Sequence, residues 1–567
     1  MQASHLSNAG IFILLALATI AAHAIFIPVG YYFHDSDMSV PLLFAEHVRK
    51  GEWSAFYFQQ SYGGTALSYL RALWVAIYEH FNPTHTGYLK GHMIFSYCVG
   101  PTLATWFSYM CAKRYCSMAG ALVAGLVTAV SFQGMIQHCG DDFYYAFFIA
   151  APLLLMMASK TQSFFLESTR NRLALGGILC GFMFYTFRGF LIYILAVMVP
   201  WKQTFAEARR LLAPRGGLEK TGIGLVYFLL ALYLYLDFFG PVIGDYKGRP
   251  VKLYPEPNLT IVAAIILLLE LKIRYKSISL DFVKRAGIFI AGFATGFLPE
   301  IFHRLGKNDT IILGNWETNS LMQALDLLAN RFAMSVRQLL LGHEIYNIYN
   351  GILKNTPYLL LIFGIWALLR ESKRRPQLLP VLIALVLGIL AFFRVHKSGA
   401  GQYRYLIPVL PVAALMAGIL WDHVYKKGLK YRILVALLVA AACSYQLIQR
   451  QLVMKSTIQL GKIDEISRVV DYFKRNGVRV VISDEFFQSN HYTFYGREKP
   501  FFVSTGRIWG PPEGFELANT EKRVGILLTT GKLRPDAGRR LQIRGRSFQL
   551  GECTGIYNNK LCIGVET

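Results

Sequence analysis

The chain has 567 residues, of which 54% are hydrophobic, and its mean hydropathy is +0.38. Long apolar runs recur along most of its length, so this composition argues against a soluble multidomain enzyme and predicts a polytopic α-helical membrane protein. The net charge of +24 would suggest nucleic acid as the partner of a soluble protein. Here the positive-inside rule accounts for most of that charge, and we expect no nucleic-acid binding.

Thirteen membrane-spanning helices are predicted from the apolar runs. The first covers about Gly10 to Gly30. It lacks a basic stretch before it and many further spans follow it, so we interpret it as an uncleaved helix rather than a signal peptide. The other twelve are predicted near residues 93–111, 118–134, 143–158, 173–187, 189–201, 221–240, 259–271, 286–302, 354–370, 377–393, 404–421 and 433–449.

Basic residues cluster in alternate connectors between these spans. By the positive-inside rule these connectors face the cytoplasm, and the other loops face outward together with the segment after Arg450. We therefore predict a multi-pass protein of the cytoplasmic membrane whose C-terminal part is extracytoplasmic. The clusters are Lys113 and Arg114; Lys160, Arg170 and Arg172; Lys202, Arg209, Arg210, Arg215 and Lys220; Lys272, Arg274, Lys276, Lys284 and Arg285; Lys373, Arg374 and Arg375; and Lys426, Lys427, Lys430 and Arg432.

The first outer loop places ionisable side chains immediately after the first span. His34, Asp35 and Asp37 lie there, where ionisable groups are costly and therefore usually functional. The residues from Met38 to Arg49 have the pattern of a helix lying on the bilayer surface. An aromatic stretch and the segment Gln60-Ser61-Tyr62-Gly63-Gly64-Thr65 follow. We interpret this loop as the floor of an active site, with Asp35 and Asp37 as catalytic candidates and His34 and Tyr62 lining the substrate.

The second outer loop adds His138, Asp141 and Asp142. We interpret them as a second acidic site, on the acceptor side; the alternative is that an aspartate only caps the helix that starts at Phe143. Hard oxygen ligands from separate loops could also hold a divalent ion such as Mg²⁺ or Mn²⁺, although a metal-free site is the favoured interpretation. The predicted metal ligands are Asp35, Asp37 and Asp141.

Basic residues on the outer face are sparse. Arg188 interrupts an apolar run where two short spans meet, and snorkelling towards the headgroups is its alternative explanation. A second group crowds one short loop, against the positive-inside bias. An anionic ligand explains this departure, and phosphate suits a fork of Arg donors. The residues of that loop that we predict to bind phosphate are Arg394, His396, Lys397, Arg404 and Tyr405.

A long outer loop runs from His303 to Asn350 and contains Trp316 and Glu317, which we expect to line the substrate. Loops of this length usually serve as lids or binding surfaces. The alternative is a helix that packs onto the bilayer surface.

The tail differs in composition from the rest of the chain. Residues 463–473 have helical periodicity, Val478 to Ile482 and Val524 to Leu528 have strand patterns, and Ile556 to Leu561 indicates a hairpin turn. We therefore predict a catalytic membrane domain over residues 1–449 and a small extracytoplasmic α/β domain over 450–567. Cys553 and Cys562 flank the hairpin, where a disulfide and two free thiols are equal alternatives. The other six cysteines are interpreted as helix-packing residues.

These features in this order resemble the GT-C superfamily of polytopic glycosyltransferases, and within it the branch of protein O-mannosyltransferases and lipid A aminoarabinose transferases. The resemblance rests on the acidic first loop, the short acidic second loop, the basic break at Arg188, the Arg404-to-Pro411 run Arg-Tyr-Leu-Ile-Pro-Val-Leu-Pro and the Gln60-to-Thr65 segment. It implies that a sugar moves, with inversion, from a polyprenyl-phosphate donor to an acceptor hydroxyl of a glycan, lipid or protein on the outer face.

The resemblance also implies roles for individual residues. Asp35 or Asp37 would be the general base, Arg188 would stand where relatives often carry Lys, and Arg404 would contact the carrier phosphate. Relatives often have Asp-Glu in the first loop, whereas this chain has Asp-Ser-Asp, so both aspartates stay candidates.

Two other classes of function compete with this one. A transporter or lipid flippase would place charged groups along a path near the bilayer midplane, whereas here they gather in outer loops. A non-catalytic scaffold would leave the first loop and the Arg394-to-Arg404 loop without a purpose.

Overall fold

The computed structural model describes the following residues: 8–28, 36–55, 57, 64–130, 142–159, 164–186, 190–198, 201, 243–246, 249–252, 280–304, 336, 351–395, 406, 409–459, 462–484, 486–505, 511–529, 540–543, 545–556 and 559–567.

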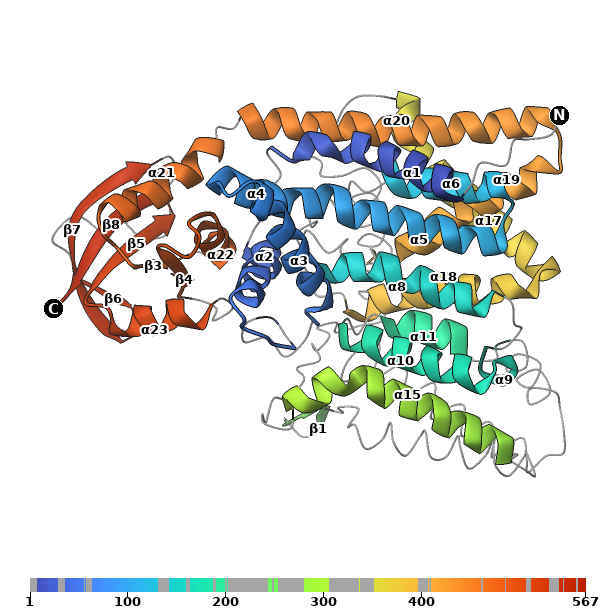
Figure 1. Ribbon diagram of the computed structural model, residues 1–567, viewed down its shortest axis with the longest axis horizontal. Helices are drawn as coiled ribbons and strands as arrows, with labels where there is room; N and C mark the ends of the chain where they lie inside the picture. The colour runs from blue at the N-terminus through green and yellow to red at the C-terminus, as the bar shows by residue number, and fades with distance from the viewer. Residues whose placement is uncertain are drawn as a thin grey trace.

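Most of the molecule is a bundle of helices that run side by side, up and down, between two ends (Figure 1). Its members are α1 (Asn8–His23), α5 (Gly100–Tyr115), α6 (Met118–Val130), α8 (Asp142–Ala158), α9 (Phe164–Glu167), α10 (Arg170–Thr186), α11 (Leu191–Met198), α15 (Leu280–Arg304), α17 (Gly351–Arg374), α18 (Leu379–Val395), α19 (Leu410–Tyr425) and α20 (Leu429–Gln459). Short 3₁₀ turns, η1 (Ala24–Phe26) and η6 (Pro376–Leu378), extend α1 and precede α18.

Each predicted span that falls on described residues contains a helix of the bundle. The spans predicted at 221–240 and 259–271 lie outside the described residues, and the count of thirteen spans stays a prediction. Within the described part, three helices are long and apolar enough to cross a membrane by length and composition. They are Asn8–Phe26, Val283–Phe302 and Leu429–Gln449, and four shorter apolar helices accompany them.

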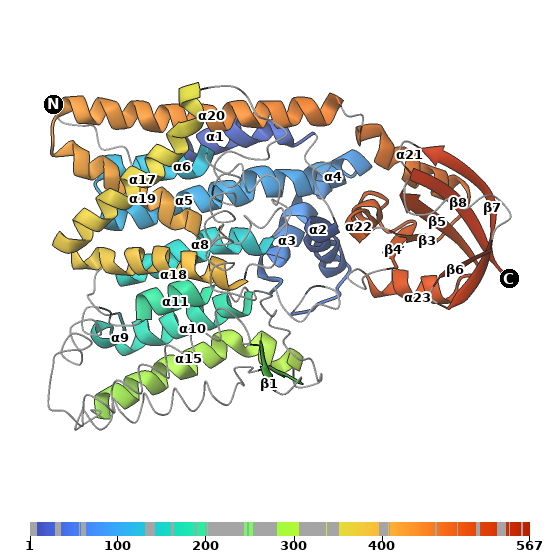
Figure 2. The same ribbon diagram turned by 180° about the vertical axis from the view of Figure 1, so that it is seen from behind.

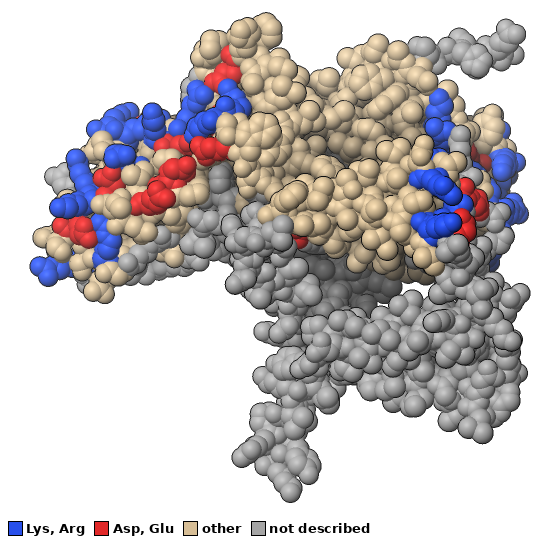
Figure 3. Space-filling view, turned by 60° about the horizontal axis from the view of Figure 1, so that its bottom comes forward, with Lys and Arg blue, Asp and Glu red and all other residues tan. Residues whose placement is uncertain are grey.

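The described members of the predicted basic clusters lie at one end of the bundle. Lys113 at the end of α5 donates a 2.8 Å hydrogen bond to Asn8 at the start of α1, and Arg375 after α17 reaches the carbonyl of Tyr115 at the end of α5. Figure 3 shows Lys and Arg gathered at this end and again over the C-terminal sheet, with a broad surface of other residues between them. The observed arrangement is the one that the positive-inside rule predicts for a membrane-embedded bundle.

Glycines let α10 and α15 approach each other closely. A Cβ on Gly181 would lie 2.0 Å from the carbonyl oxygen of Phe293, and one on Gly296 would lie 2.0 Å from that of Ile178. Gly177 and Gly292 stand four residues before them and make the same kind of contact. Glycine pairs four residues apart are typical of membrane helices whose backbones touch, because no side chain separates them.

Three further helices lie between the bundle and the C-terminal sheet. They are α2 (Ser36–Arg49), α3 (Ala66–Phe81) and α4 (His85–Ile94), which continues through a π-helical turn, η3 (Phe95–Val99), into α5. The helix predicted after Met38 is confirmed as α2, but its predicted place on the bilayer surface is wrong: Leu42, Leu43 and Ala45 are fully buried. The outer loop is therefore a packed layer and not a surface segment.

The C-terminal residues form a six-stranded mixed sheet with helices on both faces (Figure 2). The strand order is β4-β3-β5-β8-β7-β6, with β3, β4 and β5 parallel and the remaining pairs antiparallel. The elements are α21 (Lys462–Arg475), β3 (Val480–Ser483), α22 (Phe486–Tyr495), β4 (Phe501–Ser504), α23 (Pro512–Thr520), β5 (Arg523–Thr529), β6 (Arg540–Ile543), β7 (Arg546–Ile556) and β8 (Asn559–Glu566). A separate hairpin pairs β1 (Ile243–Tyr246) with β2 (Arg249–Lys252).

Alternating side chains of β3 build a core on each face of this sheet. Val480 and Ile482 pack with Phe515 of α23 on one face, and Val481 packs with Phe473 of α21 on the other. Cys553 and Cys562 are opposite each other in the β7/β8 register and form a disulfide, which decides between the two alternatives left open by the sequence.

Candidate active site

Most of the predicted site residues lie outside the described part of the chain. They are His34, Asp35, Tyr62, His138, Asp141, Arg188, Trp316, Glu317, His396, Lys397, Arg404 and Tyr405. Three more are placed by their backbone alone: Asp37 in the first turn of α2, Asp142 at the start of α8 and Arg394 in the last turn of α18. Their predicted roles, including the metal ligands Asp35, Asp37 and Asp141, stay predictions.

The helix ends nearest to these residues share one end of the bundle. The start of α8 and the ends of α10, α15 and α18 all lie opposite the basic end, where α2 and α3 pack (Figure 1). The topology therefore brings the first turn of α8 and the last turns of α10, α15 and α18 to a single face.

A direct backbone contact joins the first outer loop to the end of α10. The amide of Gly64 donates a 2.8 Å hydrogen bond to the carbonyl of Thr186, the last residue of α10. Thr65 donates its amide to the hydroxyl of Tyr185 at 3.3 Å, and that hydroxyl donates in turn to the carbonyl of Ala55. A Cβ on Gly64 would lie 2.8 Å from both Thr186 and the ring of Tyr185, so glycine is required there. The last two residues of the predicted Gln60-to-Thr65 segment are therefore hydrogen-bonded to the end of α10.

A cavity of about 470 Å³ opens beside this contact. Its size and largely apolar wall are typical of sites for organic ligands. Trp53 at its rim is 74% exposed, and its ring lies 5.3 Å from that of Tyr69, whose hydroxyl donates a 2.7 Å hydrogen bond to the carbonyl of Ser54. The lining residues are Trp53, Ser54, Ala55, Ala66, Tyr69, Phe182, Tyr185 and Pro299.

A buried carboxylate lies next to the cavity wall. Glu300 follows Pro299 near the end of α15, within the candidate span Val283–Phe302, and is 1% exposed. It is close enough to Tyr185 to interact with it electrostatically. Ionisable residues within a span are expensive and mark functional sites. Glu300 is not among the site residues predicted from the sequence, although an acidic residue that interrupts an apolar run could have revealed it.

Ion pairs hold the last turn of α2. Glu46 accepts hydrogen bonds from Arg49 at 2.8 Å and from buried His92 of α4 at 2.9 Å, and Arg49 also pairs with Glu79 of α3. Burial favours the protonated form of Glu46, but His92 and Arg49 outweigh it and lower the pKa of this carboxyl. The ionised carboxylate links α2 to α4, and Arg49 links α2 to α3.

His47 lies between carboxylates of two different parts of the chain. Its Nδ1 faces Glu52 of the first loop, and its Nε2 lies 2.9 Å from Glu498, beyond α22. Burial lowers the pKa of His47, but the bonds and charges of Glu498 and Glu52 more than offset burial and raise the pKa above its ordinary value. The positively charged imidazolium is the form that two neighbouring carboxylates favour.

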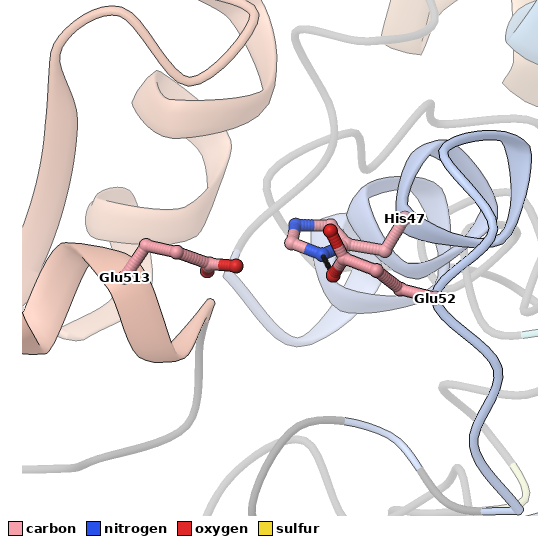
Figure 4. A group of neighbouring side chains, drawn as sticks. All are labelled: His47, Glu52 and Glu513. Atoms are coloured by element: carbon pink, nitrogen blue, oxygen red, sulfur yellow. Dashed lines mark hydrogen bonds and ion pairs between the residues drawn. The ribbon is translucent and has the colours of Figure 1, made fainter.

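Glu513 of α23 faces His47 and Glu52 across the junction (Figure 4). One potential metal-ligand atom from each of the three residues lies within 4.8 Å of the other two. A histidine and two carboxylates are suitable ligands for a divalent ion. A metal would first have to displace the proton of His47, which the raised pKa opposes, so the arrangement favours an ion pair over a metal centre.

A bundle of apolar helices with its basic residues at one end and its loops, cavity and buried carboxylate at the other defines a polytopic helical membrane protein. No protein-family model matches the chain, and no curated protein matches it. Its fold, however, is found among solved structures.

Two of these are the Archaeoglobus fulgidus oligosaccharyltransferase, in complex with Zn and sulfate, and ArnT from Cupriavidus metallidurans, bound to undecaprenyl phosphate. The first is 13% identical, with a TM-score of 0.50 over 91% of this chain and 67% of the other. ArnT is 10% identical, with a TM-score of 0.50 over 99% of this chain and 98% of the other. Both are GT-C glycosyltransferases, so the similarity confirms the predicted resemblance at the level of the fold.

Proposed function

We propose that this chain is an inverting glycosyltransferase of the bacterial inner membrane. It transfers a sugar from a polyprenyl-phosphate carrier to a hydroxyl of a glycan, lipid or protein on the outer face. The GT-C fold supports this reaction class, and ArnT, which shares the fold over almost its whole length, is known with undecaprenyl phosphate bound. Fold alone does not identify chemistry, so the proposal also needs a site.

The observation that carries the proposal is the contact between Gly64 and Thr186. It fastens the loop that begins with Asp35 and Asp37 to a helix end two residues before Arg188, beside the 470 Å³ cavity. This contact supports the proposed pairing of the acidic loop with the basic break, which is the arrangement that a base and an anionic leaving group need.

The reaction itself requires little of the protein beyond positioning and charge. Asp35 or Asp37 takes the proton of the acceptor hydroxyl as its oxygen attacks the anomeric carbon, a contribution of about 10²–10⁴ in rate. The bond from that carbon to the phosphate oxygen breaks, and the polyprenyl phosphate leaves as an anion. Arg188 and the Arg394-to-Tyr405 loop supply donors for its charge. Because the leaving group is stable as an anion, no strong general acid is needed.

The donor's isoprenoid chain explains the membrane setting. It requires an apolar groove, while the reacting atoms need the polar interface. The cavity offers an apolar wall built by Phe182 and Pro299, with Tyr185 and Ser54 as its polar members.

Mass spectrometry of cell-envelope glycans, with and without the protein, tests this function. We expect one sugar-modified product to disappear on deletion, to return with the wild-type chain, and to stay absent with Asp35→Asn or Asp37→Asn. Asp281→Asn is the matched control, because Asp281 pairs with Arg285 at the basic end of α15 at 2.8 Å. An unchanged glycan profile after deletion would refute the proposal, as would a protein that moves a labelled carrier lipid without forming a covalent product.

A further inference from the structure

The turn that follows α22 belongs to the C-terminal domain and contacts the helices α2, α3 and α4. Arg497 donates a 2.8 Å bond to Glu79 of α3, and its guanidinium lies 4.3 Å from the ring centre of Tyr88 of α4. The next residue, Glu498, lies 2.9 Å from His47 of α2 and pairs with Lys50 beyond it. Two consecutive residues thus contact three helices.

An apolar contact anchors the same turn. Phe494, in the last turn of α22, is fully buried and belongs to the core of the helical bundle, not to that of the sheet. Its ring centre lies 5.2 Å from that of Tyr88 and 5.0 Å from that of His92. Tyr88 also donates its hydroxyl to the carbonyl of Phe494 at 3.4 Å. This end of α22 is therefore part of the bundle.

The backbone of the turn is strained. Arg497 has a φ of 54° and Glu498 a φ of 62°, both in the left-handed region that glycine adopts without cost. Residues persist in this region only where the surrounding structure over-determines them, and such strain clusters at functional sites. Here both side chains carry the contacts, so the strain is tied to the docking of this turn on α2, α3 and α4.

The helix held in this way is the one that begins beside the proposed base. Glu498 pairs with His47 in the last turn of α2, and Arg497 pairs with Glu79, which also pairs with Arg49 of that turn. Asp37 lies in the first turn of the same helix. The middle of α2 is buried, with Leu42, Leu43 and Ala45 fully enclosed, and close-packed interiors transmit strain. A shift of its last turn therefore also shifts its first.

We propose that Arg497 and Glu498 are positioning residues of the active site: they clamp the last turn of α2 and so fix the place of Asp37 at its other end. The C-terminal domain thereby controls whether the outer loop is held ready for reaction. The catalytic part of this inference rests on the proposed function, whereas the clamping of α2 does not.

Glycine variants test the clamp without straining the backbone, because glycine accepts a left-handed φ. Hydrogen exchange is measured on the full-length protein in lipid nanodiscs, for the wild type and for Arg497→Gly/Glu498→Gly. We expect amide exchange over residues 36–50 to rise at least about tenfold in the double variant. Arg479→Gln is the control, since it removes a 2.7 Å ion pair with Glu521 inside the same domain. Unchanged exchange in α2, or an equal rise in the control, would overturn the clamp.

The positioning role has its own readout in cells. The glycan product is measured per molecule of protein in the membrane, so that a loss of folding is not counted as a loss of activity. We expect at least about a fivefold fall in the glycine double variant and near wild-type product with Arg497→Lys, which keeps the charge. Faster exchange in α2 with undiminished product would refute the positioning role. If Asp35→Asn and Asp37→Asn leave the product unchanged, the proposed function fails, and the exchange result still decides whether the clamp exists.

Discussion

The amide of Gly64 and the carbonyl of Thr186 are joined by a 2.8 Å hydrogen bond across 122 positions of sequence. This single contact joins the first outer loop to the end of α10, next to Ala66 and Tyr185, which line the cavity. Its geometry allows no side chain at Gly64, which makes that position the most direct test of the site.

We expect Gly64→Ala to lower both stability and product formation. The new Cβ would lie 2.8 Å from Thr186 and from the ring of Tyr185, and overpacking of this kind costs about 1–3 kcal/mol. The thermal midpoint of the protein in nanodiscs and the glycan product are the two measurements. Gly555→Ala is the control, because nothing lies within 4 Å of a Cβ there. Equal behaviour of the two variants would contradict the close approach.

Glu300 offers a test of the buried carboxylate. Glu300→Gln keeps the shape of this buried side chain and replaces its carboxyl group by an amide. If the carboxyl group serves the reaction, the product per molecule falls by about tenfold or more while the thermal midpoint stays within a few degrees. Product at the wild-type level would assign Glu300 to helix packing alone.

The junction around His47 predicts a pH dependence. Despite burial, Glu498 and Glu52 raise the pKa of His47 in the folded protein above 6.5. The stability that protonated His47 contributes is therefore complete below pH 6.5 and is lost as the pH rises through that raised pKa. Despite burial, His47 and Lys50 lower the pKa of Glu498 in the folded protein below 4.5. The stability that ionised Glu498 contributes is therefore present above pH 4.5 and is lost as the pH falls through that lowered pKa. Docking is therefore strongest between these two values.

The measurement is the thermal midpoint against pH for the wild type and for His47→Gln. From pH 6.5 to 9 we expect the thermal midpoint of the wild type to fall, and that of the variant to fall less, because only the wild type loses the charge of His47. Parallel profiles would show that His47 does not titrate in this window.

The disulfide between Cys553 and Cys562 gives a test of both stability and compartment. It closes a loop of nine residues, for which the chain-entropy estimate is about 2–3 kcal/mol. Cys553→Ser/Cys562→Ser should destabilise the sheet by that amount in a denaturant series. Peptide mapping of protein taken from cells under alkylating conditions should find the bond formed, because the periplasm is oxidising. Two free thiols there would contradict the predicted outer location.

The sequence by itself determined the class of the molecule, its helices and the shared end of its basic residues, because hydropathy and charge bias are properties of each segment alone. It also indicated the strands of the tail. It could not show that α2 is buried rather than lying on the bilayer, since an apolar face fits a lipid surface and a protein core equally well. Only the tertiary structure decided three other features: the contact of Gly64 with Thr186, the close approach of α10 to α15, and the contacts of Arg497 and Glu498 with the helices around α2. Each depends on a partner that is tens to hundreds of residues away, and no local pattern specifies which distant segment will fill a given space.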